Sequence, residues 1–383
     1  MFYLIYLLVV GISFAPFIFP KIDIWHAQGI WVQSMTLVIF SYSLFERPKY
    51  VGPTNKSLFL LNLWVGGFTA FICFVAQHKQ SYDVKHFFPY FNFLCLMVLY
   101  KMIVHYLNRN QIRKILDGMK YVVIVTLVMS GLQYIGMAQF FEFLRNNEWY
   151  HDSPVVGFIG NGTHLSGFLA TTIPLFLIVS RENALALITM FLILCVSGTS
   201  LRDPALSGFL VAIAILIFTF VKNKRSLWIV FWTLAALVTV ILILAPGDLL
   251  LRFFSFNGRI ELWKFYSSFF ASFKTMALTG FGPGAINIIY KDTPFDNIRH
   301  MHMEYFHFAF EVGLIGLVLI LNAIKEFFAV KTESNINKAM FLGFLVSACF
   351  NYPAHLWLPA TWAVFNYAAV YAERNHALNK ETN

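Results

Sequence analysis

Residues 299–324 read RHMHMEYFHFAFEVGLIGLVLILNAI, which places three histidines and two glutamates at the start of a long apolar run. A helix needs about 20 mostly apolar residues to cross a bilayer, and residues 303–324 reach that length. An ionisable side chain at membrane depth costs roughly 3 kcal/mol and usually marks a functional site. The stretch therefore predicts a membrane helix with a chemically active first part.

The composition of the whole chain agrees with a membrane protein. It is 58% hydrophobic and 12% charged, whereas a soluble domain carries about 25% charged residues. The four cysteines all lie in apolar runs, and their spacing matches neither a disulfide framework nor a zinc site. The first 19 residues are apolar, without preceding basic residues or a small-residue cleavage site, so we expect a retained span. Residues 1–383 are thus predicted to form one integral membrane domain.

The hydropathy pattern predicts an all-α polytopic fold with about twelve transmembrane helices. Prolines interrupt some of the weaker candidates, including the last two. The predicted spans are 1–19, 28–45, 57–77, 87–107, 118–138, 157–180, 183–199, 204–221, 226–245, 303–324, 338–352 and 356–372.

Basic residues predict the orientation of these spans, because cytoplasmic loops carry an excess of Lys and Arg. With the N-terminus inside, most loop Lys and Arg residues fall on the inner side. Both chain ends are then cytoplasmic, and the long loop 246–298 lies outside. The short outer loops hold only Lys21, Lys79, Lys85, Arg145 and Arg202.

The long outer loop contains a predicted interfacial helix over residues 258–276. A basic amphipathic helix of this kind lies on a membrane surface. One interpretation ends there. In the other, Arg259 points into a cavity and binds an anion, and Trp263, one turn later, stacks on its guanidinium group. The residues that form the apolar face are Leu262, Phe265, Tyr266, Phe269, Phe270, Phe273 and Met276.

A glycine-rich segment, GFGPGA at residues 280–285, follows this helix. It fits the dinucleotide pattern Gly-x-Gly-x-x-Gly/Ala, but no strand precedes it and no βαβ unit surrounds it. We therefore predict a tight turn that returns the chain to the membrane.

Four ionisable residues in the opening stretch share one face if the segment is helical, because their spacing follows the helical period. His302 lies off this face. The face is either a hydrogen-bonded polar seam between helices or part of a reactive site. The four residues are His300, Glu304, His307 and Glu311.

A metal site is a further alternative for the same segment. Glu304-x-x-His307 resembles one half of a di-iron bundle site, and Glu148-x-x-His151 offers a possible second half. Further carboxylate ligands are not evident, so we expect no metal.

Arg202 is the other notable outer charge. It follows Ser197-Gly-Thr-Ser200 and precedes Asp203, so a simple loop ion pair is one interpretation. The other is a second anion-binding guanidinium, because arginine stays charged and binds phosphate oxygens bidentately.

Five segments of the chain carry a resemblance to a known family. They are GFIGNGTHLSGFLA at 157–170, Ser200-Leu-Arg202, Gly258-Arg259 with Trp263 and the 280–284 glycines, His302-Met-Glu304-Tyr-Phe, and Glu311-Val-Gly313-Leu-Ile-Gly316. In their order and spacing, these segments resemble the O-antigen ligase and polymerase superfamily of bacterial envelope glycosyltransferases, over roughly residues 155–355, including the outer loop 246–300. Met303 stands where the family usually has asparagine, and Leu201 separates the serine from the arginine of the serine-arginine motif.

This resemblance implies transfer of a glycan from undecaprenyl diphosphate to an acceptor hydroxyl at the periplasmic face of the bacterial inner membrane. It implies an inverting, metal-independent reaction without a cofactor, nucleotide sugar or nucleic-acid partner. The leaving diphosphate needs fixed cations, so we expect Arg259 and Arg202 to hold it and Arg299 to add positive charge. His302 would be the general base, since histidine titrates near neutral pH, and Glu304 would orient His302 or a sugar hydroxyl.

The acceptor distinguishes the remaining alternatives. A ligase would join the finished glycan to the lipid A core, and a polymerase would join it to another carrier-linked repeat unit. The compact size, single dominant outer loop and twelve predicted spans favour the ligase slightly. A transporter of lipid-linked saccharides could use the same cationic cavity, but it would often show an internal repeat and broken helices at mid-bilayer. No repeat is visible here, and the charged cluster lies at one face rather than in the middle.

Overall fold

A computed structural model of the chain describes its helical framework, and every described element is an α-helix or a 3-10 helix. The described residues are 1–19, 22–48, 55–78, 88–136, 155, 157–159, 162–179, 259–286, 303–332, 335–349 and 353–381. The elements are α1 Phe2–Gly11, η1 Ile12–Phe14, α2 Ala15–Ile18, α3 Ile24–Ser43, α4 Lys56–His78, α5 Phe88–Tyr106, α6 Arg109–Tyr134, η5 Gly157–Ile159, α7 Gly162–Thr171, α8 Ile173–Val179, α13 Arg259–Ser272, α14 Lys274–Thr279, α16 Glu304–Ala329, α17 Ile336–Ser347, η8 Pro353–His355 and α18 Trp357–Glu381.

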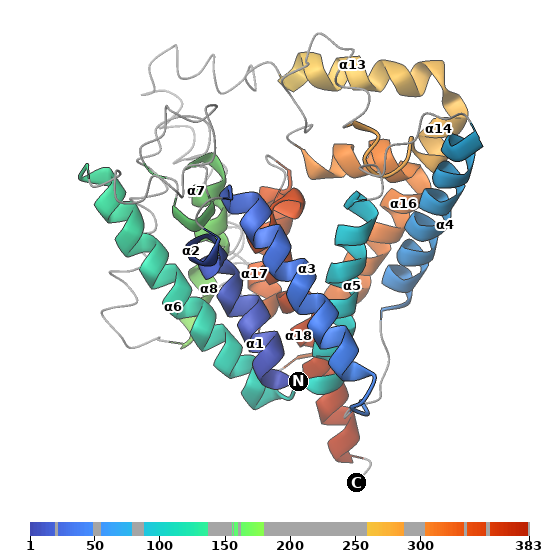
Figure 1. The fold of residues 1–383 in the computed structure, drawn as a ribbon. Helices are drawn as coiled ribbons and strands as arrows, with labels where there is room; N and C mark the ends of the chain where they lie inside the picture. Colours follow the sequence, from blue (N-terminus) through green and yellow to red (C-terminus); the bar gives the residue numbers. More distant parts are fainter. Residues whose placement is uncertain are drawn as a thin grey trace, which may run out of the picture.

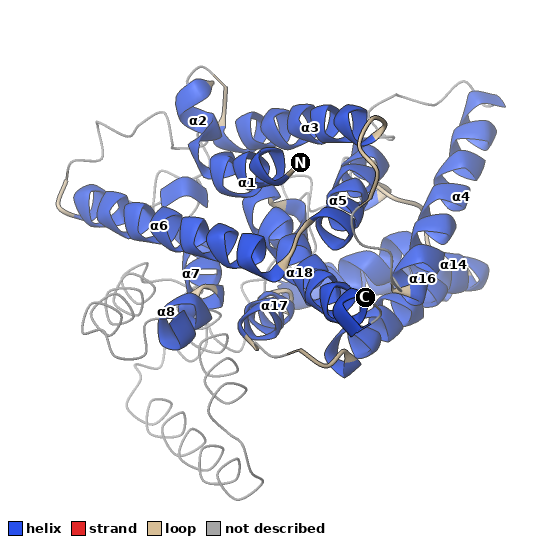
Figure 2. Cartoon of the chain, turned by 90° about the horizontal axis from the view of Figure 1, so that it is seen from below, coloured by secondary structure: helices blue, strands red, loops and turns tan. Residues whose placement is uncertain are grey.

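The C-terminal helix α18 is central to the packing of the bundle. It packs against α3, α5, α6 and α17, and α1 lies against α3 and α6 (Figure 2). Phe365 of α18 is fully buried in the main apolar core, together with Leu8 of α1 and Ile103 of α5. Both termini lie at the same end of this bundle, and α13 lies across the opposite end (Figure 1).

Two helices, α6 and α16, are long and apolar enough to cross a membrane, with mean hydropathies of 1.7 and 2.0. Other predicted spans within the described residues also coincide with helical segments, but their membrane crossing stays a prediction. The predicted spans 183–199, 204–221 and 226–245 lie outside the described residues.

Local capping shifts two helix starts away from the predicted boundaries. Asp23 accepts hydrogen bonds from the N–H groups of Trp25 and His26, so α3 begins at residue 24 rather than 28. Asn108 and Gln111 form a capping box, so α6 begins at residue 109 rather than 118. A cap fixes the first turn through its side chain, and the apolar pattern begins only further along.

Three predicted continuous helices are interrupted. The segment 1–19 changes to a 3-10 turn before Pro16, and 157–180 breaks at Thr172 before Pro174. Proline lacks an N–H group and clashes with the preceding turn, which explains these two breaks. The predicted helix 258–276 is divided at Phe273, whose backbone is not helical, with φ of −125° and ψ of 71°.

A buried amide joins three helices within the bundle. The Nδ2 group of Asn55, just before α4, donates to the carbonyl oxygen of Ala323 at 3.1 Å and to the hydroxyl of Tyr371 at 2.8 Å. The Tyr367 hydroxyl donates to the same Ala323 carbonyl at 3.0 Å. These bonds connect the start of α4 to α16 and α18.

Candidate functional site

The start of α16 is held by the segment that follows α17. The backbone N–H of Glu304 donates to the carbonyl of Ala348 at 2.9 Å, after Met303 in extended conformation. The Glu304 side chain is 1% exposed. A carboxylate at this position also interacts favourably with the helix macrodipole.

The Glu304 carboxylate is bound by the short turn η8. It accepts a hydrogen bond from the N–H of Ala354 at 2.6 Å, and its Oε2 lies 3.0 Å from Nδ1 of His355. Loss of surrounding water lowers the pKa of His355, but the Glu304 carboxylate outweighs this effect and raises that pKa above its ordinary value. The His355 side chain remains 26% exposed, so the pair lies at an accessible edge.

His307 and Glu311 extend this cluster along the same face of α16. The His307 ring lies 4.2 Å from the His355 ring, measured between centroids, and its Nε2 lies 3.2 Å from Oε1 of Glu311. Glu304, His307 and Glu311 are all buried. The predicted common face is confirmed for these three residues, and its fourth member, His300, lies outside the described residues. One ligand atom from each of Glu304, His307 and His355 lies within 4.8 Å of the others, a spacing that could hold a metal ion.

The glycine-rich segment is a turn, as predicted, and it docks directly on α16. The N–H of Gly284 donates to Oε1 of Glu311 at 2.8 Å, and the N–H of Gly282 donates to the Glu311 carbonyl at 2.9 Å. That carbonyl is accessible because α16 is kinked at Gly313, where φ is 69° and ψ is −176°. The turn thereby fixes Glu311 through both its backbone and its side chain.

Helix α13 lies above the first part of α16 (Figure 1). Tyr266 of α13 is fully buried and meets Phe310 of α16 in an edge contact with centroids 5.1 Å apart. The predicted apolar face is therefore confirmed in its first part. Its far end differs, because Phe273 and Met276 follow the helix break and are 52% and 39% exposed.

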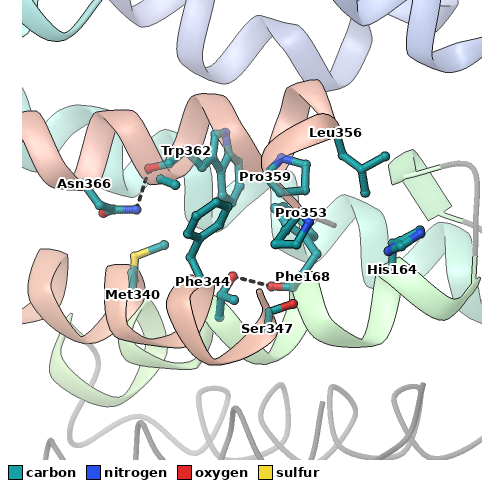
Figure 3. Close-up of a pocket in the computed structure, with 12 residues that line it drawn as sticks. His164, Phe168, Met340, Phe344, Ser347, Pro353, Leu356, Pro359, Trp362 and Asn366 are labelled. Atoms are coloured by element: carbon teal, nitrogen blue, oxygen red, sulfur yellow. Dashed lines mark hydrogen bonds between the residues drawn. The ribbon is translucent and has the colours of Figure 1, made fainter. Parts of the chain in front are cut away.

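A mainly apolar pocket lies between α7, α17 and α18 and shares the turn η8 with the Glu304 cluster. Figure 3 shows that side chains from α7, α17, η8 and α18 line it, including Phe168, Phe344 and Trp362. His164 and Ser347 contribute polar groups to its lining. The turn that supplies Pro353 to this pocket also supplies His355 to the cluster.

The described residues test only part of the predicted site. Glu304 is in the cluster, and Trp263 is half-buried on α13. Arg259 begins α13, but its side chain lies outside the described part. Arg202, Arg299, His302, His300 and the Glu148-x-x-His151 pair also lie outside the described residues, so their roles stay predictions.

Sequence reasoning did not identify His355. The feature that could have indicated it is its position in the short segment Pro353-Ala-His355, between two apolar runs that were predicted as spans. Its partner Glu304 is 51 residues away in the chain, and no helical periodicity connects them.

Comparison with known proteins identifies no family, because no family model and no curated protein matches the chain. The function of the chain is therefore inferred from the residues of the site.

Proposed function

We propose that this protein is a membrane glycosyltransferase that moves a glycan from undecaprenyl diphosphate to an acceptor hydroxyl. The observation that carries the proposal is the buried Glu304 carboxylate with its two neighbouring histidines. It lies in the first turn of the membrane-length helix α16, below the helix that Arg259 begins.

The exposed surface of α16 supports the proposal that this helix lies in the membrane. Leu314, Val318 and Leu321 follow the helical repeat and are exposed. Exposed apolar stripes of this kind are unfavourable in water and are expected where a helix faces lipid. The termini and α13 lie at opposite ends of the molecule (Figure 1), which agrees with cytoplasmic chain ends and a periplasmic α13.

The proposed donor site uses cations around the start of α13. A diphosphate leaving group develops negative charge as its bond to the sugar breaks, and preorganised cations stabilise that charge best. Arg259 and Arg202 would bind the diphosphate, with Arg299 adding positive charge and Trp263 holding the Arg259 guanidinium by stacking. The contact between Tyr266 and Phe310 supports this arrangement, because it fixes α13 against α16.

The proposed reaction is a single displacement at the anomeric carbon. The acceptor oxygen forms a bond to that carbon while the bond from the carbon to the diphosphate oxygen breaks, with inversion. His302 takes the acceptor proton, and undecaprenyl diphosphate leaves with the bonding electron pair. Glu304 is the positioning residue, because its contacts with Ala354 and His355 fix the start of α16, two residues after His302. As the resemblance implies, no metal or nucleotide sugar takes part in the transfer step itself.

The acceptor is proposed to be the lipid A core, which makes the protein an O-antigen ligase. The test is a glycolipid gel of a lipopolysaccharide-producing host that depends on this protein, comparing wild type, Arg259→Ala and the control Lys264→Ala at equal protein levels. Lys264 has the same charge on the same helix and is exposed.

Loss of long glycan from lipid A in Arg259→Ala, with full-length chains still on the carrier, would support the ligase. Collapse to a single repeat unit on lipid A would replace it with a polymerase. A profile equal to that of Lys264→Ala would refute the role of Arg259.

A further inference from the structure

We propose that Glu304, His307 and His355 form a binding site for a divalent transition-metal ion of the zinc class. This site goes beyond the proposed glycosyl transfer and does not depend on it, because metal binding alone reveals it. Its donors are one carboxylate and two imidazoles, which come from two separate elements, α16 and η8.

The donor atoms are already close enough for one ion. They lie within 4.8 Å of one another, and Nδ1 of His355 is 3.0 Å from the Glu304 carboxylate. Zinc binds nitrogen and oxygen ligands at about 2.0–2.2 Å, so tetrahedral ligands are separated by roughly 3.4 Å. Small side-chain rotations would therefore bring all three donors to bonding distance.

The backbone holds the two elements of the site together without a metal. Residues spaced by three positions share a helix face, which aligns Glu304 with His307. The N–H of Glu304 is bonded to the carbonyl of Ala348, and the N–H of Ala354 is bonded to the Glu304 carboxylate. The fold thus brings His355 to the other two donors before any ion arrives.

Glu311 gives His307 an outer partner of the kind found around metal sites. Its Oε1 lies 3.2 Å from Nε2 of His307 and is anchored by the N–H of Gly284 at 2.8 Å. Metal-binding histidines usually present their second ring nitrogen to a carboxylate or carbonyl, which fixes the tautomer. Because Nε2 faces Glu311, we assign the Nδ1 atom of His307 to the metal.

The donor set selects the class of ion. Two imidazoles and one carboxylate suit Zn²⁺ and related transition metals, whereas Mg²⁺ and Ca²⁺ prefer oxygen ligands. Three protein ligands leave a fourth position for water or another small ligand. His355 is 26% exposed, which gives an ion a path from solvent.

The experiment measures Zn²⁺ binding to the purified full-length protein in detergent, after removal of metals with EDTA. Isothermal titration with ZnCl₂ should show one ion per chain, and His355→Ala and His307→Ala should each weaken binding at least about tenfold. His26→Ala is the matched control, because His26 is an exposed histidine that also lies beside a carboxylate, Asp23.

Each outcome decides the proposal. Saturable binding that falls in His355→Ala and persists in His26→Ala would support it, provided that both metal-free variants keep the wild-type unfolding temperature. Absence of binding, or equal binding in all variants, would overturn it. If His307→Ala fails to fold, His355→Ala carries the test alone, since its side chain lies at the edge of the cluster. None of these results depends on glycosyl transfer, so failure of one proposal does not imply failure of the other.

Discussion

Substitution of Gly280 or Gly313 by alanine should loosen the contact between the glycine-rich turn and the kink of α16. An added Cβ at Gly280 would lie 2.2 Å from the Glu311 carbonyl oxygen and 2.5 Å from the Gly313 nitrogen. An added Cβ at Gly313 would lie 2.3 Å from the Leu278 carbonyl oxygen and 2.4 Å from the Gly280 nitrogen. The obstacles are backbone atoms, so no side chain can rotate away.

The expected loss in the free energy of unfolding comes from two effects, a steric clash and backbone strain. Real Cβ contacts stay beyond 3.0 Å, so the two backbones would have to separate by about 0.8 Å to accommodate the contact of 2.2 Å at Gly280. The φ angles of 82° and 69° add backbone strain, which costs about 1–3 kcal/mol for a residue with a side chain. We expect each substitution to lower the free energy of unfolding by about 2–4 kcal/mol.

The assay is thermal and denaturant unfolding of the purified protein in one detergent, with Gly131→Ala as control. Gly131 lies in α6, and nothing lies within 4 Å of its added Cβ, so alanine there should be neutral or slightly stabilising. The double variant should cost less than the sum of the single variants, because both separate the same two backbones. Costs below about 0.5 kcal/mol in both single variants, or full additivity, would refute the proposed close approach.

Two further predictions concern the buried packing. Asn55→Ala should destabilise the protein by about 2–3 kcal/mol in the same unfolding assay, because the Ala323 carbonyl and the Tyr371 hydroxyl lose a buried donor. Ser43→Ala, which removes an exposed bond, should change little, and equal effects would contradict the amide's role. Phe310→Ala should cost about 3–5 kcal/mol because Phe310 is fully buried between α13 and α16. Phe273→Ala should cost under about 1 kcal/mol at its exposed position, and a reversed order would contradict the described docking of α13.

The helical framework was largely predictable because long apolar segments indicate helices directly. Their boundaries were less predictable, since Asp23 and Asn108 cap helices ahead of the apolar pattern. The breaks before Pro16 and Pro174 were not predicted, since 1–19 and 157–180 were expected to be continuous spans. Nothing in the pattern of residues 258–276 indicated the break at Phe273 either. The apolar pattern describes burial, and local hydrogen bonds decide where each helix starts and stops.

The candidate site was predictable only where its residues share one helix. The helical period placed Glu304, His307 and Glu311 on a common face, and the structure has them there. His355 reaches Glu304 through the packing of α16 against the segment after α17, a tertiary contact that no local pattern encodes. The kink at Gly313 was likewise invisible, because glycine is compatible with an uninterrupted apolar helix in a sequence.

The most direct measurement of the proposed activity is the release of free undecaprenyl diphosphate by the purified protein, given a lipid-linked glycan and an acceptor. For wild type and Lys264→Ala, we predict that one undecaprenyl diphosphate is released for each glycosylated acceptor formed. For Arg259→Ala, we predict that the rate of release falls at least about a hundredfold. Transfer of the intact donor across a vesicle membrane without release would contradict the account and indicate a transporter. Release by Arg259→Ala at the wild-type rate would contradict the proposed diphosphate site.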